Sequence, residues 1–174
     1  GKAFIVNQAD WSTGSDDYLT VVNLSNYTTS TIALGVSSDH ITKANGKVYV
    51  SNGYFGSGNS VSVINTTTNV VEDVIDLGAG NSPSTLQEKN GVLYVLAASN
   101  IFKINTVDNF IAGAIEIPST IESPSNLTIA DSKIYFTGNS TSVYATELSA
   151  STVSATAILS YTSTSAYGPM YGFA

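Results

Sequence analysis

The segment GKVYVSNGYFGSGNSVSVINTTTNVVEDVIDLG, residues 46–78, decides the fold of this 174-residue chain. It holds three short runs rich in Val, Ile and Tyr, separated by turns rich in Gly, Asn, Ser and Thr. β-branched and aromatic residues in short runs bounded by such turns are typical of β-strands. The third run, 70–77, also has apolar residues at helical spacing, but its length and β-branching favour a strand.

The first run of this segment recurs along the chain at intervals of 45, 45 and 41 residues. Its copies are GKAFIV (1–6), GKVYV (46–50), GVLYV (91–95) and SKIYF (132–136). A second run follows each copy and ends at Asn23, Asn65, Asn105 and Glu147. The period therefore carries more than one strand.

A third and a fourth run complete the unit. The third runs are TSTIALG (29–35), VVEDVIDLG (70–78), FIAGAIEIP (110–118) and TVSATAILS (152–160). The fourth runs, DHITKA (39–44), STLQEK (84–89) and SNLTIA (125–130), each lead into the next copy. Four strands in a unit of about 43 residues are typical of a β-propeller blade. We therefore predict an all-β fold, a single β-propeller domain over 1–174 with four four-stranded antiparallel blades.

Three of the four prolines occupy the same phase of the repeat. Pro83, Pro124 and Pro169 fall in the loop before the innermost strand, where proline ends one blade and orients the next.

The second repeat consists of GKVYVSNG and NSVSVINTTTNVVEDVIDLG, followed by NSPSTL (81–86). These segments resemble the YVTN-type propeller repeat, in which YV-[TS]-N leads to v-x-V-I-D-x-x-T-N-x-V, a glycine and a proline loop. Asn65 stands where that family usually has Asp, which alters a turn residue.

The resemblance covers the second repeat best, the first and third less well, and the fourth least. The sequence looks particularly like the YncE-like surface and periplasmic propellers of bacteria and the surface-layer propellers of archaea. This resemblance implies a propeller fold and an extracytoplasmic location, secreted, periplasmic or on the cell surface. It leaves the activity open, because one fold supports many functions.

The segment GPMYGFA, residues 168–174, matches the loop and first strand of a further repeat. We expect its strand, 170–174, to pair with residues 3–7 of some chain. It could close a four-bladed ring, belong to a larger seven- or eight-bladed propeller, or complete a blade of a neighbouring subunit in a head-to-tail ring or filament. Gly1 is not Met and no signal peptide follows it, so we expect a processed or excised chain.

Composition excludes several functions. The chain has a formal net charge of −7, six Lys and no Arg, so we expect no nucleic-acid partner. It has no Cys, which excludes disulfides and thiolate metal sites. No apolar stretch approaches the roughly 18 residues of a spanning helix, so we expect no membrane insertion.

The polar rim of the central channel supplies the first candidate ligand-binding residues. His40, the only histidine, aligns in the repeat with Thr85, Asn126 and Tyr171 at the start of the innermost strand. A Ser-His-Asp triad could use only His40, and a cluster of histidines around a metal is excluded. These four residues either bind a small ligand at the channel mouth or simply hydrate it.

Aromatic residues in the hairpin loops supply the second group. Trp11, Tyr54 and Phe55 are expected on the same rim, where they could stack on a sugar, anchor a protein partner, or fold down as lids over the blades. The glycines of the loop 53–58 resemble a phosphate cradle, but a strand and not a helix follows, so they are predicted to be turn residues.

Two weaker signals concern ions and glycans. Asp10, Asp16 and Asp17 lie in one hairpin loop and could contact Ca²⁺, although the loop lacks the EF-hand pattern, so a solvated hairpin tip is preferred and no metal site is predicted. Five sequons, about as many as composition alone would produce, mark candidate glycosylation sites. They are Asn23, Asn26, Asn65, Asn126 and Asn139.

The sequence thus predicts a non-catalytic, extracytoplasmic propeller that serves as a binding or assembly module on the cell surface. Its partner would be a protein, a glycan or another copy of itself, and no cofactor is expected. One alternative is a lactonase- or lyase-like propeller enzyme acting at the channel mouth. Another is a filament or surface-layer subunit that assembles by strand exchange.

Overall fold

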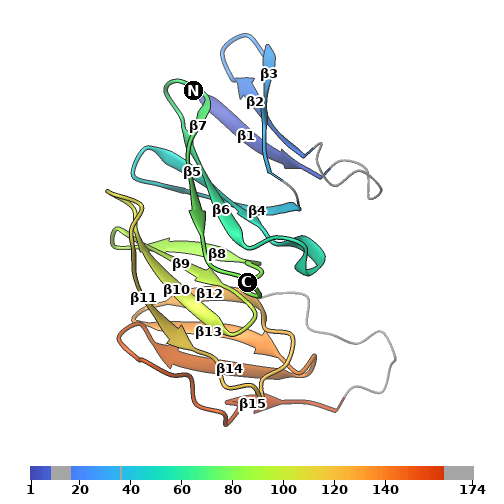
Figure 1. Ribbon diagram of the computed structural model, residues 1–174, viewed down its shortest axis with the longest axis vertical. Coiled ribbons are helices and arrows are strands. Elements are labelled where there is room, and N and C mark those ends of the chain that lie inside the picture. Colours follow the sequence, from blue (N-terminus) through green and yellow to red (C-terminus); the bar gives the residue numbers. More distant parts are fainter. Residues whose placement is uncertain (9–16, 36, 163–174) are drawn as a thin grey trace.

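The computed structural model describes residues 1–8, 17–35 and 37–162. These residues form fifteen β-strands and one short 3₁₀ turn, η1 (Tyr54–Gly56). The strands make four separate antiparallel sheets that follow one another in chain order (Figure 1). No helix among the described residues is long and apolar enough to span a membrane. The all-β propeller fold predicted from the repeats is confirmed.

Each sheet is one blade, and the strands of a blade pair in sequence order. The strands of the first and second blades are β1 (Lys2–Asn7), β2 (Tyr18–Asn23), β3 (Thr29–Ala33), β4 (Ser38–Ala44), β5 (Lys47–Asn52), β6 (Ser60–Asn65) and β7 (Val70–Asp76). Three strands of the first blade are described. The segment 170–174, expected to pair with β1, lies outside the described residues.

The third and fourth blades have four strands each. They are β8 (Leu86–Lys89), β9 (Val92–Leu96), β10 (Asn100–Asn105), β11 (Ile111–Glu116), β12 (Ser125–Ala130), β13 (Lys133–Gly138), β14 (Ser142–Glu147) and β15 (Leu159–Ser160). The first strands of successive blades pack side by side, β4 against β8 and β8 against β12. These inner strands therefore place equivalent residues of the repeat close to one axis.

The core lies between the blades, and strand alternation produces it. On β5, Val48 and Val50 pack against the first blade, whereas Tyr49 packs against the third. Successive side chains point to opposite faces of a strand, so a blade between two others is apolar on both faces. Burial of each such side chain stabilises the fold by about 1.5–3 kcal/mol. This explains the continuous apolar runs in the sequence.

A repeated lysine bridge also joins neighbouring blades. The ammonium of Lys2 in the first blade donates to Asn69 Oδ1 and to the Thr66 carbonyl in the second, each at 2.8 Å. Lys47 in the second blade donates to Asn109 Oδ1 in the third at 3.1 Å. Asn69 (φ 58°) and Asn109 (φ 60°) both adopt the left-handed conformation that Asn tolerates well. The turn between the third and fourth strand of one blade thus receives a lysine from the blade before it.

The fourth blade differs from its predicted form. The segment 152–160 was expected to be one outer strand, but only β15 pairs there with β14. Thr152 instead forms a parallel bridge with Glu116 of the third blade. The Glu116 N–H donates to the Ser151 carbonyl at 2.9 Å, and the Val153 N–H donates to the Glu116 carbonyl at 2.8 Å. These bonds draw the start of the segment onto the edge of β11, which shortens the outer strand.

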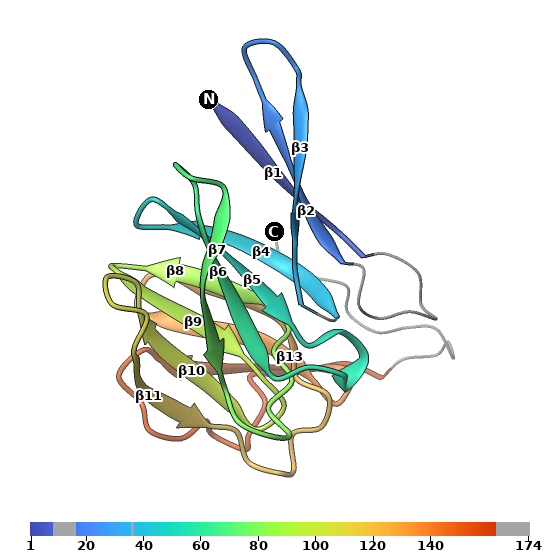
Figure 2. The same ribbon diagram turned by 45° about the horizontal axis from the view of Figure 1, so that its top comes forward.

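The described blades form a row whose ends lie apart. The first blade is at one end and the fourth at the other, with the second and third between them (Figure 1). Figure 2 shows the sheet β1-β2-β3 at its end of the row, with no described strand against its outward face. Each end of the row therefore presents one sheet face that no described blade covers.

Candidate functional site

A β-bulge lies at the start of each inner strand of the second, third and fourth blades. Between Ser38 and Ile41 the register of β4 shifts against β5, so that Asp39 and His40 together face one residue. Ser84 and Thr85 both bond to Leu96, at 2.8 and 2.9 Å. The register of β12 shifts in the same way between residues 125 and 128, a stretch that contains Asn126.

These bulges place three of the predicted rim residues, His40, Thr85 and Asn126, at comparable positions. A bulge leaves one residue out of the regular ladder and redirects its side chain. The pattern could not be read from the sequence, because it depends on which residue of the partner strand each pairs with. Tyr171, the fourth predicted rim residue, lies outside the described residues.

The ring of His40 contacts the carboxylate of its neighbour Asp39, and the two form an ion pair when the ring is protonated. Its Nδ1 lies 2.8 Å from Asp39 Oδ2, and the side chains are 47% and 22% exposed. The hydrogen bond that the Asp39 carboxylate accepts from the ring raises the pKa of His40 above 6.5, and the negative charge of Asp39 adds to this against the opposing effect of burial. Gln8, the residue that follows β1, donates to the other oxygen of Asp39 at 3.3 Å. The pair therefore joins the first blade to the second.

The arrangement around His40 does not form a nucleophilic triad among the described residues. Ser51 is the serine opposite the bulge, but its hydroxyl accepts the backbone N–H of His40 at 3.0 Å. Ser51 is also fully buried, with 0% of its surface exposed. A triad needs the serine hydroxyl on the imidazole and open to substrate. Here Ser51 fixes the backbone of the bulge instead.

Asn126 belongs to a hydroxyl network in the fourth blade. Its side-chain amide donates to Thr137 Oγ1 at 3.1 Å, and the hydroxyls of Ser125 and Thr137 lie 2.8 Å apart. Asn126 has a φ of 56°, the left-handed region that Asn enters at low cost. Its amide is therefore held in place at the rim.

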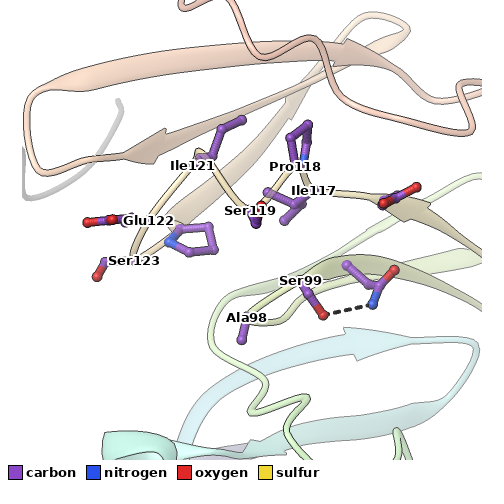
Figure 3. A pocket seen from close by; sticks show the side chains of 11 residues that line it. Ala98, Ser99, Ile117, Pro118, Ser119, Ile121, Glu122 and Ser123 are labelled. Atoms are coloured by element: carbon purple, nitrogen blue, oxygen red, sulfur yellow. Dashed lines mark hydrogen bonds between the residues drawn. The ribbon is translucent and has the colours of Figure 1, made fainter.

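A groove of about 840 Å³ opens at the third and fourth blades. One wall is the turn between β9 and β10, with Ala98 and Ser99, and the other is the connection from β11 to β12, with Pro118, Ser119 and Glu122 (Figure 3). It ends at Pro124, two residues before Asn126, so the groove and the bulges belong to one face of the propeller. Its volume is within the range of small-ligand sites.

Asparagine side chains hold both walls of the groove. Asn139 accepts the Glu122 N–H at 2.6 Å and donates to the Thr120 carbonyl at 3.2 Å. It also donates to the hydroxyl of Tyr144 at 2.9 Å. On the opposite wall, Ser99 donates to Asn81 Oδ1 at 3.1 Å. The β11–β12 connection is thus fixed by backbone and amide bonds although it contains no strand.

The charge of the groove has one sign. Among its eleven lining residues the ionisable ones are Glu116 and Glu122, and both are exposed. Ser99, Ser119 and Ser123 add hydroxyls, and two prolines add apolar surface. No group of three or more His, Asp or Glu residues that could hold a metal ion occurs in the part of the chain that is described. The groove therefore suits a cationic or neutral ligand and disfavours an anion.

The aromatic rim residues are only partly placed. Tyr54 begins η1 and is half-buried, and its N–H donates to the Ser37 carbonyl at 3.0 Å. Phe55 lies in the same turn, and Trp11 lies outside the described residues. Gly53 packs directly on the next blade, since an added Cβ would lie 2.1 Å from the Pro83 carbonyl oxygen. β6 follows the loop, so these glycines serve a turn and a close blade contact.

The hairpin loop that was weighed as a weak calcium candidate has one described carboxylate, Asp17. Asp17 is buried and accepts the backbone N–H of Ser38, which ties the first blade to the start of β4. Asp10 and Asp16 lie outside the described residues. The role found for Asp17 is therefore to fix the entry into the second blade.

The five sequons differ in how their amides are used. Asn65 donates to Glu72 at 2.9 Å and Asn139 to the groove wall, so both amides are engaged. Asn26 is exposed, and its oxygen accepts the Thr28 hydroxyl at 2.9 Å. Asn23 accepts the Ser25 N–H, the same turn bond that Asn65 makes with Thr67, each at 2.9 Å. In the structure, these asparagine side chains therefore stabilise turns and connections by hydrogen bonds.

Comparisons with known proteins identify the fold. No protein-family model matches the chain, and no curated protein matches it. Among solved structures it is similar to the WD40 domain of Toxoplasma gondii coronin, with 13% identity and a TM-score of 0.65 over 86% of this chain and 42% of that one. It is also similar to glutaminyl cyclase of Myxococcus xanthus, with 16% identity and a TM-score of 0.54 over 81% of this chain and 62% of that one.

A third similar structure is the AfRom2 CNH domain, with 11% identity and a TM-score of 0.59 over 87% of this chain and 48% of that one. At these identities the likeness shows the fold alone. The chain spans between 42% and 62% of the length of these three structures.

Proposed function

We propose that this chain is a non-catalytic β-propeller binding module that acts outside the cytoplasm. Its groove would hold a lysine- or arginine-bearing segment of a protein partner. The observation that carries the proposal is the groove of about 840 Å³ whose ionisable lining residues are Glu116 and Glu122. A cleft lined by charge of one sign concentrates ligands of the opposite sign, and the net charge of −7 adds to this attraction.

The groove walls support binding over catalysis. Asn139 and Asn81 hold the two walls in place before a ligand arrives, which lowers the entropic cost of binding. Among the described residues of this face, Asp39 and His40 form an acid–base pair, and the hydroxyl of nearby Ser51 accepts the backbone N–H of His40. A lactonase- or lyase-like reaction would need a cluster of carboxylates or a bound metal at the channel mouth. The hydroxyls and the two carboxylates of the groove lining support the recognition role that we propose.

The location outside the cytoplasm is supported by the resemblance of the second repeat to the YVTN-type pattern. Lys47 and Asn69 belong to the glycine-lysine and threonine-asparagine positions of this repeat, and both take part in the lysine bridges between blades. The structure therefore gives these positions a physical role. Fractionation of the native host with an antibody to the chain would test the location, and recovery from the cytoplasm alone would refute it.

Fluorescence anisotropy with a labelled peptide of alternating lysine and glycine tests the ligand class. We expect it to bind, to weaken as salt rises, and to bind about fivefold more weakly to the double variant Glu116→Gln/Glu122→Gln. The matched control is Asp131→Asn, which removes one carboxylate in the turn between β12 and β13. Equal affinity of the double variant and the wild type would refute the role of the groove. Salt-independent binding of a neutral oligosaccharide would mean that the ligand is a sugar and not a cationic peptide.

A further inference from the structure

We propose that the two uncovered faces of the row bind each other between copies. The fourth blade of one copy would dock on the first blade of a second copy and repeat the junction found inside the chain. The contact would use no residue of the groove. It follows from four positions of the repeat, two on each face.

Tyr135 marks the outward face of the fourth blade. It is the third residue of β13, as Phe4, Tyr49 and Tyr94 are of β1, β5 and β9. Each of those three packs into the core formed with the next blade. Phe136, next to Tyr135, packs toward the third blade, so Tyr135 points away from it. Tyr135 is therefore the blade-joining aromatic at the end of the row.

Lys133 is the lysine of the same face. It is the first residue of β13, equivalent to Lys2 and Lys47, which bridge to the turn of the next blade. Here Lys133 pairs with Glu147 of its own blade at 3.3 Å, and both side chains are about half exposed. Such a surface pair contributes little to stability, so a better acceptor can replace it.

Ile5 marks the outward face of the first blade. Its counterparts are Val50 on β5 and Val95 on β9, each the fourth residue of its strand. Val50 and Val95 are 0% exposed, because the preceding blade covers them, whereas Ile5 is 49% exposed. A blade placed against β1 would cover Ile5 as the internal blades cover its counterparts.

The turn 23–28 is the counterpart of the turns that receive the lysine bridges. Tyr27 has a φ of 58°, as Asn69 has, and its N–H donates to the Asn23 carbonyl as that of Asn69 donates to the Asn65 carbonyl. A tyrosine is sterically disfavoured at this φ, but Tyr27 adopts it. Tyr27 is also 77% exposed. Its ring face can hold an ammonium group, and the Leu24 carbonyl stands where Thr66 accepts Lys2. Lys133 of a second copy fits this turn.

The contact joins two different faces, so each copy keeps one face free for the next. Such a head-to-tail contact closes a ring if the rotation between copies fits and otherwise continues as a filament. The proposal is consistent with either a ring or a filament. A chain that stays monomeric contradicts it.

Sedimentation velocity of the full chain over about a hundredfold range of concentration gives the first test, since association by mass action must grow with concentration. We expect dimers or a longer series. Lys133→Ala should weaken the association, whereas Lys43→Ala, which removes an exposed lysine of β4, should not. A monomer at every concentration overturns the proposal.

A mixing experiment tests the pairing of the two faces. Ile5→Asp blocks only the face of the first blade, and Tyr135→Asp blocks only that of the fourth, so each variant alone should be monomeric. An equal mixture retains one intact pair of faces and should give one-to-one dimers and nothing larger. Val107→Asp, which charges an exposed apolar residue of a third-blade turn, is the matched control and should assemble as the wild type does.

Circular dichroism would establish that each variant folds. If Tyr135→Asp does not fold, Lys133→Glu blocks the same face from a half-exposed position. A mixture that contains only monomers, or blocked variants that assemble as the wild type does, would overturn the pairing.

Discussion

The ammonium of Lys47 lies 3.1 Å from Asn109 Oδ1 and 3.2 Å from a carboxylate oxygen of Glu72, so one lysine joins the second blade to the third. The hydrogen bond from Asn65, followed by that from Lys47, lowers the pKa of Glu72 and keeps this carboxylate charged. Beside them, burial and the charges of Glu72 and Asp73 raise the pKa of Tyr49 to about 12. Its hydroxyl therefore stays protonated and donates to Asn109 at 3.0 Å.

Loss of this bridge should destabilise the chain. Lys47→Met keeps the apolar stem and removes the charge, and it should lower the free energy of unfolding by about 1.5–3 kcal/mol, because hydrogen bonds to charged groups contribute that much. Urea unfolding measures the change. Lys43→Met is the control and should stay within about 0.5 kcal/mol of the wild type. Equal losses in the two variants would mean that the bridge contributes nothing.

Substitutions of Asn69, which has the left-handed conformation, can separate the energetic contribution of that conformation from the contribution of its hydrogen bond to Lys2. Asn69→Ala should destabilise by about 1–2 kcal/mol, since alanine is unfavourable at a φ of 58° and also loses the acceptor for Lys2. Asn69→Gly should recover the conformational part alone. Thermal melting of both variants gives the comparison, and a glycine variant no more stable than the alanine variant would contradict this division.

Gly53 should tolerate no side chain. An added Cβ would lie 2.1 Å from the Pro83 carbonyl oxygen, so Gly53→Ala must move the second blade relative to the third and should cost about 1–3 kcal/mol. Gly35→Ala is the control, because the nearest atom to its added Cβ is 3.8 Å away. Urea unfolding of the two variants should separate them clearly. A Gly53→Ala protein as stable as the Gly35→Ala protein would exclude the close contact.

His40 should titrate above its ordinary pKa of 6.5. It is the only histidine, so its ring proton gives a single NMR titration. The bond to Asp39 favours the charged ring, and Asp39→Asn should lower the pKa.

Because the folded pKa is the higher one, the added stability is complete below 6.5 and is lost as pH rises through the folded pKa. The wild type should exceed Asp39→Asn in stability more at about pH 5.5 than at about pH 8.5. A pKa unchanged by Asp39→Asn would show that the pair does not form in solution.

The repeat explains why the fold could be predicted. Runs of β-branched residues that recur every 41 to 45 residues specify strands, and asparagines such as Asn65 and Asn105 close each turn through their own side chains. The fourth blade was predicted less well. The backbone hydrogen bonds between Glu116 and residues 151–153 join segments that are distant in the sequence, so no local pattern predicts them.

The site was harder to predict than the fold. The rim residues His40, Thr85 and Asn126 could be aligned, but the bulges that hold them depend on strand pairing. The groove escaped prediction because its walls come from two turns about twenty residues apart. The sequence feature that could have pointed to the groove is Asn139. It belongs to a sequon, but its side-chain amide hydrogen-bonds to the β11–β12 connection. Likewise, Asp17 suggested a cation ligand until its bond to Ser38, 21 positions away, was known.

Two-dimensional amide NMR of the full chain, titrated with the lysine-glycine peptide, tests most directly that the groove is the binding site. We expect the amide resonances of Ser99 and of residues 116, 117 and 119–123 to shift with the peptide, while those of the turn 65–70 stay in place. Shifts confined to that turn, or no shifts at peptide concentrations that saturate the anisotropy signal, would contradict the account.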